Sequence, residues 1–218
     1  MTHRLEADSI FLHFGERRIL SDIYIKCETG KITGLLGRNG TGKSSLMNII
    51  YGSLACPDKS VRFDGKSVPQ AYRKPTLLAY LPQFDFVPKS LSLYRVFKDF
   101  QLDFNEFKVF FPGLPDDIKT RFGELSGGSR RLVETFLVIK TKSQFTILDE
   151  PFSHIMPVHV DKIKELIACE KQSKGFLITD HLYKNVMEIS DHLYVLANGK
   201  THLTKNIEDI ETLGYAHI

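Results

Sequence analysis

The chain has 218 residues, of which 42% are hydrophobic and 25% are charged. This composition is typical of a soluble globular protein with a full core, and it excludes a disordered or fibrous chain. The formal net charge is only +3 and the basic residues are dispersed, so a nucleic-acid-binding role has little support. The three cysteines form no CxxC pair, which argues against a disulfide framework or a zinc site and favours a reducing cytosol.

The chain shows no sign of a membrane-spanning or exported segment. Residues 1–6 lead into mixed polar residues, and nowhere do about 18 uncharged apolar residues run together. We therefore expect neither a transmembrane helix nor a signal peptide, so that any membrane role comes through a partner. At about 150 residues per domain, the length favours one domain with an insertion.

The N-terminal region predicts three strands and a helix. Half-apolar alternation predicts strands over 5–14 and 19–27, separated by a turn at Gly15. The third strand, over 31–36, is nearly all apolar, which is typical of a strand covered on both faces. A glycine-rich turn and a helix over 42–51 follow it at once. This order is half of a βαβ unit.

Two short strands, over 61–63 and 77–81, precede a change in composition. Nine of the sixteen phenylalanines lie between 84 and about 122, and five of them are spaced 3, 4, 3 and 4 residues apart: Phe97, Phe100, Phe104, Phe107 and Phe111. This spacing predicts an amphipathic helical insert. Residues 103–106 include possible helix caps, so the insert could equally be one helix or two helices that are separated there.

The phenylalanines of the insert have two interpretations. Most are expected to fill a small helical core, because each buried ring contributes about 2 to 3 kcal/mol. A segment of about 40 residues cannot easily bury nine rings. We therefore predict that Phe84 and Phe86, next to Gln83, form a patch that faces a partner.

The rest of the chain alternates helices with short apolar strands. A hairpin is predicted around Asn198 and Gly199, and Asn206 is expected to cap a last helix that ends at Gly214. Ser126 is the expected N-cap of the helix that runs to about residue 140. In chain order we expect a helix to about 140, a strand over 144–148, a helix over 158–170, a strand over 175–179, a helix over 182–189, and strands over 193–197 and 200–203.

A phosphate-binding loop is the strongest motif. Residues 37–44 fit G-x-x-x-x-G-K-[ST] between an apolar strand and a helix, which is the context that this motif requires. Its glycines let backbone amides surround phosphate oxygens at a helix N-terminus. Lys43 is expected to reach the β/γ-phosphates and Ser44 to hold Mg²⁺. The expected nucleotide contacts here are Gly37, Arg38, Asn39, Gly40, Thr41, Gly42, Lys43, Ser44 and Ser45.

Two carboxylates follow the strand over 144–148. Asp149 and Glu150 come at its carboxyl end, the edge of an α/β sheet where ligands bind. Taken alone, such a pair usually only starts a solvated loop. Beside a phosphate loop, Asp149 is suited to hold the Mg²⁺ that Ser44 also binds, and Glu150 to polarise a water for attack on the γ-phosphate.

A second glycine-rich helix start completes a set of motifs. Residues 124–129 read Glu-Leu-Ser-Gly-Gly-Ser, which by itself is more often only a helix cap. Together, the phosphate loop, this segment, the acidic pair and His181, in that order, resemble the ATP-binding subunit of ABC transporters. The resemblance covers essentially the whole chain.

The resemblance implies roles for further residues. Phe14 stands where the family stacks an aromatic ring on adenine, and Gln83 where a glutamine touches Mg²⁺ and the attacking water. His181 resembles the family's switch histidine, which contacts the γ-phosphate. The catalytic set is thus expected to be Glu150, His181, Gln83 and Lys43, and the metal ligands Ser44, Gln83 and Asp149.

The segment of Ser126, Gly127 and Gly128 resembles the signature that closes on ATP bound by the opposite subunit. The resemblance therefore implies a second ATPase subunit, most simply an identical chain, and a transmembrane permease subunit, with no nucleic acid. It also implies a cytoplasmic protein, peripheral on the inner face of the cell membrane through its partner. ATP and Mg²⁺ are the expected cofactors.

Three departures from the family pattern stand out. Ser129 occupies the place of the usual Gln, which puts one hydrogen-bonding side chain in doubt. Met156 replaces an Asp that helps to set dimer contacts, so coupling between the two sites is expected to differ. The insert between Gln83 and Ser126 is short, which suggests an unusual or absent transmembrane partner.

The expected fold is α/β: a P-loop NTPase core with an N-terminal antiparallel β subdomain and an inserted α-helical subdomain. One ABC ATPase domain is expected over 1–218, with a catalytic core at 1–83 and 144–218 and the helical subdomain at about 84–143. Within the family, the chain is most similar to the branch that serves lipopolysaccharide export and branched-chain amino-acid uptake. The alternative is a soluble ABC-type ATPase that regulates a protein or nucleic-acid machine; a small-molecule kinase would leave the signature and His181 unexplained.

Overall fold

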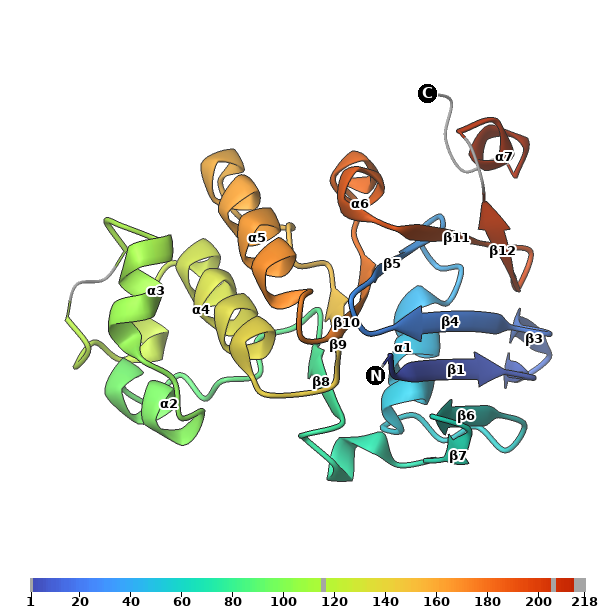
Figure 1. The fold of residues 1–218 in the computed structure, drawn as a ribbon, viewed down its shortest axis with the longest axis horizontal. Coiled ribbons are helices and arrows are strands. Elements are labelled where there is room, and N and C mark those ends of the chain that lie inside the picture. The colour runs from blue at the N-terminus through green and yellow to red at the C-terminus, as the bar shows by residue number, and fades with distance from the viewer. Residues whose placement is uncertain (1, 115–116, 205–206, 214–218) are drawn as a thin grey trace.

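The computed structural model describes residues 2–114, 117–204 and 207–213 (Figure 1). The predicted cap at Asn206 and the predicted helix end at Gly214 lie outside the described residues. Among these described residues, no helix combines the length and the hydrophobicity that a membrane span requires.

Two sheets form the framework. The larger has six strands in the order β12-β11-β5-β10-β9-β8, all parallel except for the β11–β12 hairpin. The smaller is antiparallel, in the order β4-β1-β6-β7, while β2 and β3 form a separate hairpin. The strands are β1 (Arg4–Asp8), β2 (Leu12–Phe14), β3 (Arg17–Leu20), β4 (Tyr24–Glu28), β5 (Ile32–Leu36), β6 (Ser60–Phe63), β7 (Lys66–Ser67), β8 (Leu78–Leu81), β9 (Phe145–Asp149), β10 (Gly175–Thr179), β11 (His192–Ala197) and β12 (Lys200–Thr204).

Helices cover both faces of the parallel sheet. Those of the described residues are α1 (Lys43–Tyr51), α2 (Leu93–Asp99), α3 (Phe104–Phe110), α4 (Gly127–Lys140), α5 (Pro157–Glu170), α6 (Tyr183–Ile189) and α7 (Ile207–Thr212), with 3₁₀ turns at Ala71–Arg73 and Phe122–Glu124. This is the predicted α/β P-loop core with an antiparallel β subdomain and inserted helices, so the fold class is confirmed.

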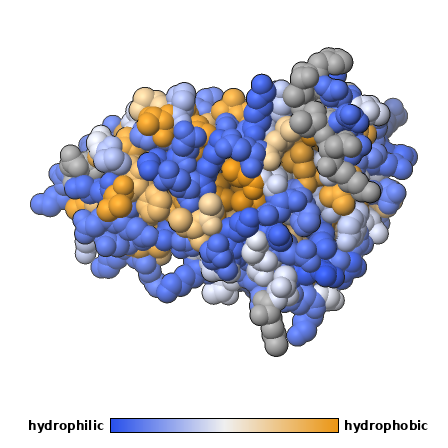
Figure 2. All heavy atoms as spheres, turned by 45° about the horizontal axis from the view of Figure 1, so that its top comes forward, coloured by the Kyte–Doolittle hydropathy of each residue, from blue (hydrophilic) through white to orange (hydrophobic). Residues whose placement is uncertain are grey.

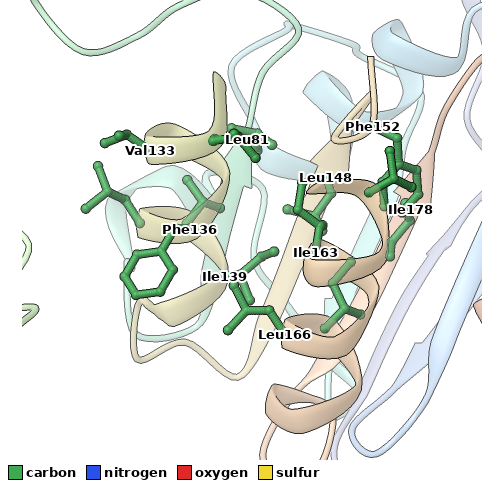
Figure 3. Close-up of a cluster of buried hydrophobic side chains, with 14 of the residues drawn as sticks. Leu81, Val133, Phe136, Ile139, Leu148, Phe152, Ile163, Leu166 and Ile178 are labelled. Carbon is green, nitrogen blue, oxygen red and sulfur yellow. The ribbon is translucent and has the colours of Figure 1, made fainter. Parts of the chain in front are cut away.

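The core has two layers on opposite faces of the parallel sheet. On one face, α1 is buried between this sheet and the antiparallel sheet. On the other, α4, α5 and α6 pack over the same strands. Figure 3 shows part of this second layer, where Ile139 of α4 lies beside Leu166 of α5. The strands β5, β9 and β10 are therefore buried on both faces, which explains their continuous apolar sequences.

The first two predicted strands are wrong in their extent. The span 5–14 is divided into β1 and β2, and the span 19–27 falls partly in β3 and partly in β4. Ser9 and Asp22 interrupt them with left-handed φ angles of 52° and 59°. Short polar residues tolerate this conformation, which ends strand pairing.

The insert contains two helices, α2 and α3, which is one of the two arrangements that the sequence left open. Asp103 caps α3 by accepting a hydrogen bond from the Asn105 amide at 2.8 Å. Of the nine rings in the insert, five are buried and line a shared core with Phe136 of α4: Phe97, Phe104, Phe107, Phe111 and Phe122. The prediction that the insert cannot bury all nine rings is confirmed.

The predicted pair of exposed rings is half right. Phe84 is 71% exposed, whereas Phe86 is half-buried against the helical core and lies 6.3 Å from Phe100 between ring centroids. Phe86 is therefore a packing residue, and only Phe84 suits a partner-facing patch. In Figure 2, hydrophobic residues reach the visible face mainly over the helical half of the molecule. The predicted subdomain boundaries near residues 84 and 143 stay a prediction.

Candidate active site

The phosphate loop lies between β5 and α1, as predicted. Its last glycine, Gly42, has φ 103°, and a Cβ atom there would lie 2.7 Å from Cγ2 of Ile19. Gly40 has φ 75°. Only glycine adopts these angles without strain, so the loop curves tightly into the N-terminus of α1.

Lys43 is folded against this loop. Its Nζ donates to the carbonyls of Gly37 at 2.6 Å and Arg38 at 3.2 Å. Burial lowers the pKa of Lys43, while the nearby carboxylates of Glu150 and Asp149 act in the opposite direction. The ammonium group therefore lies between the loop and the acidic end of β9.

One cleft of about 480 Å³ brings most of the predicted site together. The phosphate loop forms one side, and Gln83, Glu150 and His181 form another. Phe14 lines it with a ring that is 55% exposed, which is unusual for a strand residue and suits a stacking role. The lining residues are Phe14, Arg17, Ile19, Asn39, Gly40, Gly42, Lys43, Ser44, Ser45, Gln83, Glu150 and His181. Arg38 and Gly37 line an adjoining hollow together with His181.

Asp149 ends β9 in a buried position. Its Oδ2 accepts from the Tyr80 hydroxyl at 3.2 Å, whereas its Oδ1 has no hydrogen-bond partner among the described residues. Burial raises the pKa of Asp149, and the nearby hydroxyls of Ser44 and Tyr80 oppose that shift. A buried carboxylate oxygen without a partner is costly, and a bound cation would satisfy it.

Glu150 is held from two sides. Its Oε2 accepts from Gln83 Nε2 at 2.8 Å, and its Oε1 lies 2.7 Å from His181 Nε2. Glu150 is buried, whereas Gln83 and His181 are exposed toward the cleft. The three residues follow β8, β9 and β10, whose carboxyl ends meet at one edge of the sheet. The structure thus brings together three side chains that are far apart in the sequence.

The predicted signature residues lie outside the main cleft. The Ser126 hydroxyl accepts from the Ser129 amide at 3.1 Å and caps α4 as predicted. Gly127 lines a smaller cleft of about 220 Å³ with Gln83 and Glu150. One copy of the chain therefore does not bring Ser126 and Gly128 to the phosphate loop.

The two departures at single residues, Ser129 and Met156, have different surroundings. The Ser129 hydroxyl lies 2.9 Å from that of Ser126 and points back to its own helix start. Met156 is 60% exposed at the start of α5. Neither side chain disturbs the residues of the main cleft.

Several residues around the site are not predicted from the sequence. Arg17 adds a cation to the cleft beside Phe14. Tyr80 binds Asp149, Arg131 binds main-chain carbonyls, and Asp180 accepts from the Phe152 amide at 2.7 Å. Of these residues, only Tyr80 could have been found from the sequence, because it lies in a predicted strand three residues before Gln83.

Sequence comparisons relate this chain to known proteins. The family model described as "ABC transporter" matches residues 20–153. The lipopolysaccharide export system ATP-binding protein LptB of Acidithiobacillus ferridurans is 32% identical, covering 92% of this chain and 89% of the relative. The probable branched-chain amino acid transport ATP-binding protein LivG of Methanocaldococcus jannaschii is 28% identical over 90% of this chain and 87% of its own length.

Solved structures show the same fold. An ATP-binding subunit of an ABC transporter superposes with a TM-score of 0.79 at 20% identity, covering 97% of this chain and 93% of the other. A nucleotide-free ATP-binding cassette from an ABC transporter gives a TM-score of 0.74 at 23% identity, over 97% and 94% of the two chains. The relatives do not favour the alternative of a soluble regulator. The chain belongs to the ABC transporter family and is one of its ATP-hydrolysing, ATP-binding subunits.

Proposed function

We propose that the main cleft binds Mg-ATP and that Glu150 activates the water that attacks the γ-phosphate. The observation that carries this proposal is that Gln83 and His181 contact the two carboxylate oxygens of Glu150, at 2.8 Å and 2.7 Å, in the cleft that the phosphate loop lines. A base must lie within hydrogen-bond reach of the water that it deprotonates. A buried carboxylate facing a phosphate loop satisfies that requirement.

The phosphates would be held by the loop amides and by Lys43. Residues 37–44 present backbone N–H groups at the start of α1, where the helix dipole favours an anion. On binding, the Lys43 ammonium exchanges the carbonyls of Gly37 and Arg38 for phosphate oxygens. The exposed ring of Phe14 at the mouth of the cleft stacks on the adenine.

The residues around Asp149 fit a magnesium ion. Mg²⁺ prefers hard oxygen ligands and is usually held by one or two protein groups together with phosphates and water. Asp149 offers a buried Oδ1 without a partner, Ser44 lies beside it, and Gln83 faces the same cleft. Bound there, the ion would neutralise charge that develops on the phosphate oxygens.

The Glu150 carboxylate would take the proton of the attacking water. Gln83 donates a hydrogen bond to Glu150 Oε2, while Glu150 Oε1 lies 2.7 Å from His181 Nε2. His181 lies next to the phosphate loop and is placed to donate to the γ-phosphate. Lys43 stabilises the same phosphate group from the opposite side of the cleft.

The site would be completed by a second copy of the chain. Ser126, Gly127 and Gly128 lie outside the cleft of their own chain, and a helix N-terminus with free amides suits a phosphate. An identical subunit is the simplest source of these groups. We propose a pair of chains that closes on two ATP molecules and reopens after hydrolysis.

The remaining partner would be a transmembrane permease. Phe84 is strongly exposed and directly follows Gln83, which lines the cleft. A permease that contacts Phe84 would therefore also act on the backbone beside the nucleotide. The chain would then be cytoplasmic and peripheral on the inner face of the membrane. Lipopolysaccharide or a branched-chain amino acid, named for the relatives, are candidate substrates of the permease.

Replacing the base tests the proposal. The Glu150→Gln variant keeps the shape of the side chain but cannot take a proton, so ATP turnover should fall by about 100-fold or more, while ATP binding stays within a few-fold. Turnover is measured by phosphate release and binding by calorimetry. The matched control is Glu165→Gln on the exposed side of α5, which should hydrolyse ATP normally. Wild-type turnover by Glu150→Gln would rule out Glu150 as the base.

A further inference from the structure

The loop of residues 82–87, which we call the Gln83 loop, is attached at its start to α4. Arg131 Nη1 donates to the Pro82 carbonyl at 2.7 Å, directly before Gln83. Arg131 is buried, with a relative exposure of 6%. Burying a guanidinium group is costly unless its donors are satisfied, so this contact is part of a defined arrangement.

The same guanidinium group also holds the end of β9. Arg131 Nη2 donates to the carbonyl of Asp149 at 2.6 Å and to that of Glu150 at 3.0 Å. The planar group therefore joins two main-chain segments that are 67 residues apart. These are the segments that carry Gln83 and Glu150, whose side chains meet at 2.8 Å.

The far end of the Gln83 loop is attached to α4 by Glu134. This carboxylate is fully buried, and its Oε1 accepts from the amides of Phe86 at 2.7 Å and Val87 at 2.8 Å. Arg131 and Glu134 are three residues apart and so lie on one face of the helix. The loop is therefore fixed before and after Gln83 by one helix face, and an exposed Phe84 lies between the two attachments.

We infer that Arg131 and Glu134 are positioning residues for the hydrolytic reaction, an inference that rests on the proposed function of Glu150. Neither residue lies in the cleft where the phosphates bind. They hold the backbones of Gln83 and Glu150 at a fixed separation, so that the Gln83 amide orients the Glu150 carboxylate. Because Ser126 caps the start of α4, a shift of that end of the helix would move the Glu150 carboxylate with it.

Substitution of Arg131 should separate catalysis from binding. In the purified 218-residue chain, Arg131→Met should lower kcat for ATP by about 10- to 100-fold, because a displacement of about 1 Å in a catalytic group has an effect of that size. The KM for ATP should stay within about twofold, since no phosphate contact is lost. Arg131→Lys, which keeps the charge and some of the donors, should give an intermediate kcat.

Matched variants on α4 give the controls. Lys140→Met removes one positive charge from the same helix, where Lys140 pairs with Glu106 and Glu170, and should leave kcat unchanged. Glu134→Gln keeps an oxygen acceptor for the two amides and should stay within about twofold of wild type, whereas Glu134→Ala should lower kcat about tenfold. If Arg131→Met does not fold, the two Glu134 variants decide the question.

A double-substitution cycle with Glu150→Gln tells the two proposals apart. If Arg131 acts through Glu150, Arg131→Met has no further effect on the residual rate of Glu150→Gln. The inference is overturned if kcat is unchanged in folded Arg131→Met and Glu134→Ala, if only KM rises, or if the two losses multiply. Wild-type turnover by Glu150→Gln alone would instead overturn the proposed function.

Discussion

Glu150 adopts a backbone conformation that few residues of its type occupy. Its φ angle is 58°, and left-handed conformations cost a residue with a Cβ atom about 1 to 2 kcal/mol. Its amide donates to the Thr179 carbonyl at 2.8 Å, and its own carbonyl accepts from Arg131. The surrounding contacts therefore determine a strained conformation, as is common where a side chain must be aimed at a reacting group.

Tyr80 supports the proposed metal ligand Asp149. Its hydroxyl donates to Asp149 Oδ2 at 3.2 Å and accepts from Asn48 Nδ2 at 3.1 Å. Tyr80→Phe should leave Asp149 free to rotate, and the Mg²⁺ concentration needed for half-maximal ATP binding should rise about tenfold. A magnesium titration of ATP binding, followed by calorimetry, measures this. Tyr72→Phe, outside the site, should not change the titration; an unchanged titration for Tyr80→Phe would contradict a supporting role.

Lys174 makes stability depend on pH in an alkaline range. It is buried, donates to the carbonyls of Ile139 and Thr141 at 2.6 Å, and burial lowers its pKa from 10.5 to about 8. Between about pH 8 and pH 10.5, Lys174 holds a proton more often in the unfolded chain than in the folded chain. The contribution of Lys174 to the free energy of unfolding therefore rises with pH in this range, by at most about 1.4 kcal/mol per pH unit.

The matched measurement is urea unfolding of wild type and Lys174→Met between pH 7 and 10.5. Other groups titrate in both proteins, so the difference between them isolates Lys174. Wild type should gain stability relative to the variant as the pH rises above about 8. A constant difference across that range would show that Lys174 keeps its ordinary pKa.

Sequence motifs predicted most of the residues that line the cleft but not the residues that support them from behind. Lys43, Asp149 and Glu150 stand in a spacing set by the chemistry of phosphate binding, so the pattern is visible. Arg131 binds main-chain carbonyls from two distant segments. Such contacts do not depend on the residue types of their partners, so no sequence pattern marks them.

The helical insert is built around aromatic rings. Phe107 of α3 is fully buried, with ring centroids 5.2 Å from Phe111 and 5.3 Å from Phe136 of α4. The 3, 4, 3, 4 spacing predicted this apolar face correctly. It did not determine the break at Asp103, because a cap residue within a helical pattern fits one helix or two.

Truncation of Phe107 should destabilise the chain through this core. Phe107→Ala leaves a cavity among packed rings and should lower the free energy of unfolding by about 3 to 5 kcal/mol. Val109→Ala on the same helix, where the side chain is 79% exposed, should change it by less than about 0.5 kcal/mol. Chemical unfolding of both variants measures the contrast; equal stability of the two would contradict the burial of α3.

The N-terminal strands show where alternation fails as a guide. Asp22 fits an alternating pattern by polarity, yet it takes a left-handed φ and lies between β3 and β4. Ser9, which follows the polar Asp8, breaks the alternation and takes a left-handed φ directly after β1. A single backbone angle interrupts pairing without changing the polarity pattern. Phe86 is a similar case, since its residue type does not reveal that Phe100 lies beside it.

At the scale of the whole molecule, the site forms where the parallel strands end. The loops after β5, β8, β9 and β10 bring the phosphate loop, Gln83, Glu150 and His181 to one edge of the sheet. The order of these strands could be expected only from the resemblance to a family, because parallel neighbours are distant in sequence. The signature at Ser126 lies outside this cleft.

The most direct test is light scattering of the Glu150→Gln variant with and without Mg-ATP. This variant should bind ATP without hydrolysing it, so closed pairs should accumulate. We expect the mass to rise from 24.9 kDa to twice that value when Mg-ATP is added. A mass that stays at 24.9 kDa while ATP is bound would contradict a site completed by a second copy of the chain.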